Sequence, residues 1–455
     1  MRRMKNDSRR AQRRCVGALA AILMMAAPFP IGIFPIGTVP AGAGSDGEID
    51  KRFGIGGRVV TPFASGPSLA RSVAVHADGT IVAAGAVFTP AGPDFAVARY
   101  LANGTLDTSF GGTGTVTVDF GGSVDDGWPV AVQADGKIIA GGLVAVSGSI
   151  DFGLVRFNVD GSLDTSFGGD GTVTTAFLPG TTDALIDLAV QPDGKIVAVG
   201  NVNRGFGTAN FALARYHADG SLDATFGVNG LVITDVSTPS APRSDAAQAV
   251  VLQPDGKIVV GGISFTGTVT NQDFAFARYH ADGTLDTTFG VNGTASVDIF
   301  RGLTLLQDID LQSDGKIIAA GGIRLGPFEA HGVVTRLLAD GSLDVSFGMG
   351  GTITTPAIGP IPDITVRPDG KLLAVSAAFS QHERSSDFAV ARYLADGSLD
   401  PSFGFGTGII RTDFTASEHA AAVAVQTNGR IVAAGSVSLP DGSGHFALAR
   451  YLSTP

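Results

Sequence analysis

The chain has 455 residues, of which 64 are glycine and 22 are proline, and it carries a formal net charge of −11. Because 44% of its residues are hydrophobic and only 16% are charged, the chain can bury a core, which excludes an intrinsically disordered protein. The single cysteine excludes a disulfide framework and a thiolate metal site, and the abundance of glycine argues against a helix-rich fold.

The N-terminal segment 1–43 has the features of a secretory signal peptide. Seven basic residues and one acidic residue stand within positions 1–14, and an apolar run extends from Val16 to Ala27. The small residues Ala41-Gly42-Ala43 then offer a cleavage site. We expect an extracytoplasmic protein that is secreted, periplasmic or displayed at the cell surface. An uncleaved N-terminal anchor is the alternative.

Cleavage after Ala43 would change the charge of the chain. It removes seven of the 31 basic residues and one of the 42 acidic residues, which leaves a net charge of −17 and no cysteine. Nucleic acids and anionic lipids require basic patches, so we expect neither as a partner, and no membrane contact once the signal is removed. We expect the mature chain to be a monomer.

Two short phrases recur seven times along the rest of the chain. The first is an Asp-Gly or Asn-Gly turn followed by an apolar strand, and its copies recur about every 58 residues from Asp78 to Asn428. The second has the form Leu-Asp-x-x-Phe-Gly. Its aspartates are Asp50, Asp107, Asp164, Asp223, Asp286, Asp344 and Asp400.

Each repeat reads as four short strands. In the third copy the apolar segments are Leu185–Gln191, Ile196–Gly200, Phe211–Tyr216 and Leu231–Thr234. Seven four-stranded units without helical periodicity predict an all-β fold, a seven-bladed β-propeller that spans residues 44–455 as a single domain.

The repeats begin and end out of phase with the blades. The chain opens with the second phrase and a strand, Arg58–Phe63, and it ends just after a third strand, Phe446–Tyr451. We therefore predict that the N-terminal strand completes the last blade and closes the ring, which removes the exposed strand edges of an open array.

The phrases AVQPDGKIVAVG and FALARYHADGSLDATFG, which begin at Ala189 and Phe211, resemble the bacterial delta-60 repeat family. The strand order is also loosely similar to NHL-type propeller repeats. The resemblance covers residues 44–455 and implies a β-propeller, but it implies no activity. The fifth copy departs most, with Gly332 in place of the strand phenylalanine and Leu337 in place of the tyrosine.

The residues that recur in every copy predict a structural role. The Asp160-Gly-Ser-Leu-Asp164 spacing lacks the alternating aspartates of a calcium loop. We expect each recurring aspartate to form an ion pair with an arginine that ends the third strand, and the lysine after each turn glycine to be solvated. The recurring arginines are Arg99, Arg156, Arg215, Arg278, Arg336, Arg392 and Arg450.

The connections that differ between copies predict the binding face. In a four-stranded meander the two invariant turns share one face, and the two variable connections share the other. We expect the variable face of a non-enzymatic module to bind a protein or a glycan. Candidate ligand-binding residues there are Trp128, His331, His382, His419 and His445.

An alternative function is a metal-dependent hydrolase or lyase. One position near the start of the first strand carries a carboxylate in three copies, at Asp187, Asp308 and Asp363, which would face the mouth of the central channel. Carboxylates that converge on an axis can hold a divalent metal. The sequence shows no nucleophile elbow, zincin helix or nucleotide-binding loop, so we expect no other catalytic residue and no other cofactor.

Overall fold

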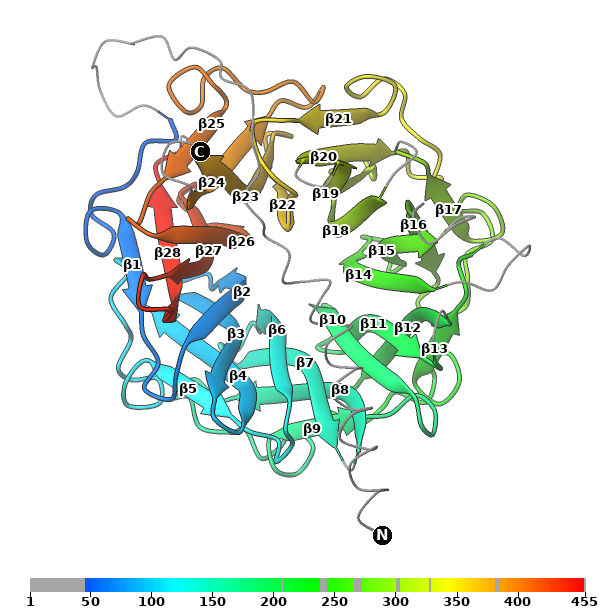
Figure 1. The fold of residues 1–455 in the computed structure, drawn as a ribbon. Helices are drawn as coiled ribbons and strands as arrows, with labels where there is room; N and C mark the ends of the chain where they lie inside the picture. Colours follow the sequence, from blue (N-terminus) through cyan, green and yellow to red (C-terminus); the bar gives the residue numbers. More distant parts are fainter. Residues whose placement is uncertain are drawn as a thin grey trace.

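The computed structural model describes residues 46–146, 148–205, 208–237, 244–265, 272–299, 303–326, 329–380 and 385–453. These residues form 28 β-strands grouped into seven blades around a central axis (Figure 1). The expected signal segment 1–43 lies outside the described residues.

Each blade is an antiparallel sheet of four strands, numbered outward from the axis. The strands of blades 1 to 3 are β2 (Ser68–Val75), β3 (Ile81–Thr89), β4 (Gly92–Tyr100), β5 (Thr115–Val118); β6 (Asp125–Val132), β7 (Ile138–Val146), β8 (Ser149–Phe157), β9 (Thr172–Thr175); and β10 (Thr182–Val190), β11 (Ile196–Asn203), β12 (Ala209–Tyr216), β13 (Leu231–Thr234). Those of blades 4 to 6 are β14 (Asp245–Leu252), β15 (Ile258–Phe265), β16 (Gln272–Tyr279), β17 (Thr294–Val297); β18 (Leu303–Leu311), β19 (Ile317–Gly326), β20 (Glu329–Leu337), β21 (Thr352–Thr355); and β22 (Asp363–Val366), β23 (Leu372–Ser380), β24 (Ser385–Tyr393), β25 (Ile409–Thr412). Blade 7 consists of β26 (Ser417–Val425), β27 (Ile431–Ser438), β28 (Gly444–Tyr451) and, from the other end of the chain, β1 (Arg58–Thr61).

The seven-bladed propeller that the repeats predict is therefore confirmed. The invariant turn explains why each first hairpin forms: in blade 3, Gly194 adopts φ of 86° and the Asp193 carboxylate accepts the N–H of Lys195 at 3.1 Å. Blades 2 and 3 are additionally joined by one parallel bridge between Thr182 and Ile150.

The N-terminal strand closes the ring as predicted. β1 pairs antiparallel with β28 from Arg58–Ala449 to Thr61–Phe446, and Figure 1 shows the blue and red strands side by side. The closure also includes an ion pair, because Arg450 Nη2 lies 2.9 Å from Asp50 Oδ2. The two ends of the propeller are thus held by backbone pairing and by a buried ion pair.

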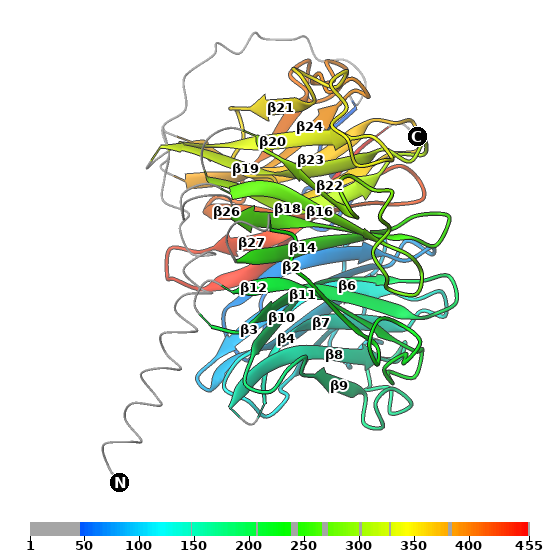
Figure 2. The same cartoon turned by 90° about the vertical axis from the view of Figure 1, so that its right-hand side faces the viewer.

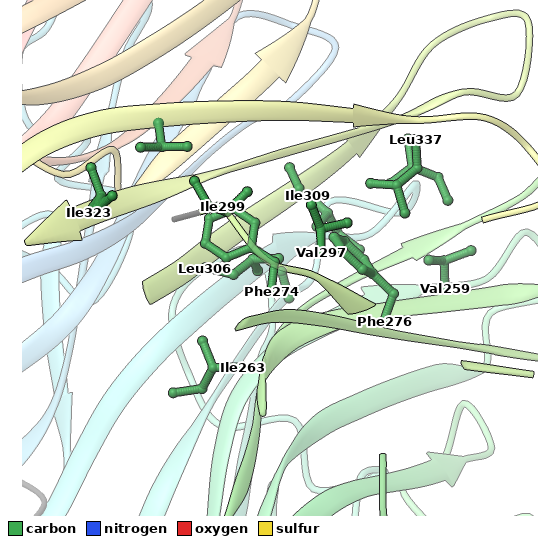
Figure 3. Packing of buried hydrophobic residues seen from close by; sticks show 14 of the residues in the cluster. Val259, Ile263, Phe274, Phe276, Val297, Ile299, Leu306, Ile309, Ile323 and Leu337 are labelled. Carbon is green, nitrogen blue, oxygen red and sulfur yellow. The ribbon is translucent and has the colours of Figure 1, made fainter. Parts of the chain in front are cut away.

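The hydrophobic core lies between blades rather than along the axis. One cluster brings Phe274 and Phe276 of blade 4 against Leu306 and Ile309 of blade 5 (Figure 3), and all four side chains are buried. Equivalent clusters fill the other interfaces, so each blade buries its two faces against two neighbours. Closure of the ring adds the cluster between blade 7 and blade 1, so that no blade has an uncovered face.

The two faces of the ring carry different connections. Seen from the side (Figure 2), the red hairpin that joins β27 and β28 projects from one face. The Asp-Gly turns and the Leu-Asp-x-x-Phe-Gly segments lie at the opposite ends of the strands, on the face that we call the conserved face. The variable connections between second and third strands and between blades form the variable face.

Tyrosines and threonines link neighbouring blades at five interfaces. The hydroxyl of Tyr216, at the end of β12, lies 2.8 Å from Thr175 Oγ1, at the end of the outermost strand of blade 2. Where the tyrosine is replaced by Phe157 or Leu337, the threonine position holds a valine instead. The five pairs are Tyr100–Thr61, Tyr216–Thr175, Tyr279–Thr234, Tyr393–Thr355 and Tyr451–Thr412.

This pattern predicts coupling between the two partners. Tyr216→Phe should lower the free energy of unfolding by about 1–2 kcal/mol, because Thr175 Oγ1 then lacks its buried partner. Adding Thr175→Val should cost less than the sum of the two single changes, because both sides become apolar, as the Phe157 interface already is. Urea denaturation of the four proteins measures the coupling. Strictly additive losses would contradict it.

Candidate functional site

The recurring charged residues form a structural network on the conserved face. In blade 3, Arg215 Nε lies 2.9 Å from Asp223 Oδ2, and its guanidinium stacks over Phe226 at 4.5 Å from the ring centroid. Arg215 Nη1 also donates to the backbone carbonyl of Ala281 in blade 4. The same Arg–Asp pair and Arg–Phe stack occur in all seven blades. These arginines therefore connect blades and are not free to bind an anionic ligand.

The turn lysines also belong to this network. Contrary to the expectation of solvated side chains, Lys195 Nζ lies 3.2 Å from Asp223 Oδ2, and Lys137 Nζ lies 2.8 Å from Asp164 Oδ2. Burial by itself would raise the pKa of Asp223. Hydrogen bonds from Thr225 and Lys195 and the charge of Arg215 outweigh it, so that the pKa lies well below the ordinary value.

The three candidate metal-binding carboxylates at the channel do not meet at one point. Each accepts a backbone N–H from the first strand of the next blade: Asp187 from Val250 at 2.8 Å, Asp308 from Ile364 at 2.8 Å and Asp363 from Val423 at 2.7 Å. Within the described part of the chain, no group of possible metal ligands within 4.8 Å of one another contains these three residues. The three carboxylates span three separate blade interfaces.

The burial of these carboxyls also affects their pKa values. Burial, with a contribution from the charge of Asp363, raises the pKa of Asp187 to about 7. Burial and the neighbouring Asp363 raise the pKa of Asp308 well above its ordinary value, and the two side chains share a hydrogen bond. The hydrogen bond between Asp308 and Asp363 joins blade 5 to blade 6.

The first strand of most blades contains a β-bulge near the channel. Bulges lie between Ala70 and Ser72 in β2 and between Gly127 and Val130 in β6. A bulge adds a residue that has no partner in the ladder and turns its side chain away from the alternating pattern of the strand. The bulge residues of blades 1 and 2 are Arg71 and Trp128.

Arg71 and Trp128 form a cluster at the channel mouth together with Asp126. The Arg71 guanidinium lies 4.6 Å from the centroid of the Trp128 ring, and Arg71 Nη2 lies 3.0 and 2.9 Å from the two carboxylate oxygens of Asp126. Trp128 is half-buried, so part of the indole reaches solvent. This cluster (Arg71, Asp126 and Trp128) combines an aromatic plane with two charged groups, and it interrupts the symmetry of the repeats.

The candidate histidines are not brought together. His331 in β20 is buried and lies 3.3 Å from Glu329, and His445 in β28 lies 3.2 Å from the Ser443 hydroxyl. His419 in β26 is exposed. Desolvation of the imidazole by the surrounding protein and the charge of Arg71 lower the pKa of His419, although part of its side chain reaches solvent. His382 lies outside the described residues. Among the described residues, His331, His419 and His445 belong to no common group of possible metal ligands.

Sequence reasoning identified Trp128 but missed its two partners. Arg71 and Asp126 each occur in a single blade, so no recurring phrase points to them. An alignment of the repeats with one another could have pointed to Arg71, because Arg71 and Trp128 occupy the same bulge position in consecutive blades.

Several solved structures are similar to this chain at low sequence identity. A polysaccharide lyase named Uly1 has 10% sequence identity and a TM-score of 0.48, with 85% of this chain and 90% of that chain covered. A protein of unknown function from Dyadobacter fermentans has 11% identity and a TM-score of 0.45, with 87% and 97% covered. Virginiamycin B lyase from Staphylococcus aureus has 9% identity and a TM-score of 0.42, with 86% and 98% covered.

No curated protein matches the chain in sequence. In the part that the structure describes, no helix is long and apolar enough to cross a membrane. Seven segments match one family, and together they make up more than half of the chain: residues 76–110, 133–167, 191–226, 253–289, 312–347, 367–403 and 426–454. Each segment contains the Asp-Gly or Asn-Gly turn and the second and third strands of one blade, and the first six also contain the Leu-Asp-x-x-Phe segment. The chain therefore belongs to the family described as a domain of unknown function (DUF5122) β-propeller.

Proposed function

We propose that the protein is an exported, non-enzymatic binding module that holds a glycan at its variable face, and that its repeats are of the delta-60 type. The observation that carries the proposal is the channel-mouth cluster. Trp128 presents an aromatic surface of the kind that stacks on sugar rings, and Arg71 and Asp126 beside it can exchange hydrogen bonds with hydroxyl groups.

The contrast between the two faces supports this assignment. On the conserved face the recurring charges are consumed by contacts between blades, as in the Arg215–Asp223 pair. On the variable face the cluster occurs in one copy, which suits a single ligand site on a repetitive frame. The signal-like segment 1–43 and the acidic charge of the mature chain are consistent with an extracytoplasmic monomer that avoids nucleic acids.

A hydrolase or lyase at Asp187, Asp308 and Asp363 is the weaker function. Their oxygens accept backbone N–H groups at separate interfaces, which leaves no shared point for a metal and a substrate. Among the described residues, these three carboxylates do not form a common group that could hold the divalent metal this alternative requires.

A binding screen with the purified protein tests the proposal. A glycan array identifies the ligand, and Trp128→Ala should then weaken its binding by at least about tenfold, as expected for a central aromatic contact. Met349→Ala is the matched control, because that side chain is 92% exposed on the conserved face. Equal binding by wild type and Trp128→Ala would contradict the site. Capture of only protein ligands would replace the glycan with a protein.

A further inference from the structure

A cluster of three acidic residues lies at the junction between blades 6 and 7. Asp387 comes from β24, Asp413 follows β25, and Glu418 belongs to β26, the first strand of the next blade. One carboxylate oxygen from each residue lies within 4.8 Å of the others. Because all three separations are at most 4.8 Å, one Ca²⁺ ion, which binds oxygens at roughly 2.3–2.6 Å, could contact all three after a small movement of the side chains.

A second observation at this cluster is that one carboxylate oxygen of Glu418 is buried and unpaired among the described residues. Its side chain is 1% exposed, and Oε1 accepts the N–H groups of Phe414 at 3.1 Å and Ala416 at 2.9 Å. Oε2 is buried and has no hydrogen-bond partner among the described residues. A buried carboxylate oxygen without a donor is costly, and a cation would satisfy it. Burial, with repulsion from Asp387 and Asp413, raises the pKa of Glu418 to about 7.

We propose that Asp387, Asp413 and Glu418 bind a calcium ion at the junction between blades 6 and 7. The three ligands are oxygens, which hard cations prefer, and the group contains no imidazole or thiolate that would favour zinc. Asp413 is exposed and Glu418 is buried, so the ion would enter from solvent and keep some of its waters. Calcium accepts such irregular sets of six to eight oxygens more readily than magnesium does.

The junction between blades 1 and 2 provides an internal comparison. Asp94, Asp119 and Asp125 occupy the corresponding positions, and their carboxylate oxygens also lie within 4.8 Å of one another. There, however, both oxygens of Asp125 accept backbone N–H groups, from Phe120 at 2.8 Å and from Ala145 at 3.3 Å. The buried acid at that junction is already satisfied. Asp183 and Asp245, at the equivalent position of blades 3 and 4, each have one buried oxygen without a partner among the described residues, but neither belongs to a group of three possible ligands. The proposal is therefore confined to the junction that contains Glu418, where both features occur.

The bound ion would tie the last blade to the one before it. Glu418 begins the innermost strand of blade 7, and Asp387 lies in the third strand of blade 6. Blade 7 is also the blade that β1 completes. Calcium would therefore stabilise the part of the ring where the two ends of the chain meet.

Calcium titration of the chelator-treated, purified protein tests the proposal. At 5 mM CaCl₂ the melting temperature should rise by roughly 2–5 °C, and calorimetry should show one saturable site with a Kd of about 10⁻⁴–10⁻³ M. Asp413→Asn, at an exposed position, and Glu418→Gln, which keeps Oε1 as an acceptor, should each weaken binding at least about tenfold.

Asp119→Asn, the matched change at the comparison junction, should leave both the affinity and the thermal shift unchanged. Three results would overturn the proposal: no calcium-dependent shift in the wild type, an equal shift with MgCl₂ at the same concentration, or unchanged calcium binding by Asp413→Asn. None of these outcomes bears on Trp128, so the glycan site stands or falls separately.

Discussion

Deletion of residues 46–63 is expected to open the ring and to produce the largest loss of stability of any change considered. The segment contributes β1, the Asp50 carboxylate that pairs with Arg450, and Phe53 and Phe63, which are 0% and 7% exposed. Burial of two phenylalanines alone is worth about 3–6 kcal/mol. Thermal unfolding should show a much lower melting temperature, and size-exclusion chromatography should show association through the free edge of β28.

A circular permutant separates ring closure from the mere loss of residues. Leu452 N–H donates to the Glu48 carbonyl at 2.7 Å, so the two ends of the propeller already lie together. Moving residues 46–63 behind residue 453 through a short glycine linker would rebuild blade 7 from one continuous segment. The permutant should recover most of the melting temperature. A deletion variant as stable as the wild type would refute the closing role of β1.

Asp223→Asn is expected to cost about 3–5 kcal/mol of unfolding free energy. Asp223 is 1% exposed and faces Arg215 Nη2 at 2.8 Å and Lys195 Nζ at 3.2 Å. The amide keeps the shape of the side chain but removes its charge, which leaves the buried guanidinium without compensation. Chemical denaturation of the wild type and the variant measures the loss.

Two comparisons sharpen this result. Asp219→Asn changes an exposed aspartate in the same connection. The Asp219 side chain only accepts hydrogen bonds from Ser221, so the unfolding free energy of this variant should stay close to that of the wild type.

The pH dependence of the unfolding free energy gives the second comparison. The pKa of Asp223 is lowered in the folded state, so its contribution is complete above the unfolded value near pH 4 and declines as the pH falls below it. The Asn variant should lack this part of the acid-induced loss. A stable Asp223→Asn protein would show that the ion pair is dispensable.

The repeats made the architecture predictable from sequence. The Asp193-Gly194 turn needs a glycine at positive φ, and the same requirement recurs in each copy. The phase of the phrases predicted that β1 would join β28, because an unpaired third strand at one end and an unpaired fourth strand at the other complete one blade. The conformational preferences of turn residues and the number and order of the repeats suffice to predict the blades and their closure.

The role of individual polar residues was less predictable. The position of Asp187 in the first strand was read correctly, but its strand position does not reveal that the carboxylate accepts the Val250 N–H of the next blade. The turn lysines were expected in solvent, whereas Lys195 reaches Asp223 in the following connection. The Asp187 contact depends on how two blades pack, and the Lys195 contact depends on how a turn and a later connection of the same blade come together.

The sequence by itself determined the number of blades, the strands within each and the manner of closure, because these follow from turn chemistry, strand patterning and repetition along the chain. Only the tertiary structure decided which polar groups are satisfied and which remain open. The bulges that bring Arg71 beside Trp128, and the burial that leaves Glu418 Oε2 without a donor, arise where neighbouring blades meet. Burial and hydrogen bonding in such places depend on residues far apart in the chain, which no local pattern specifies.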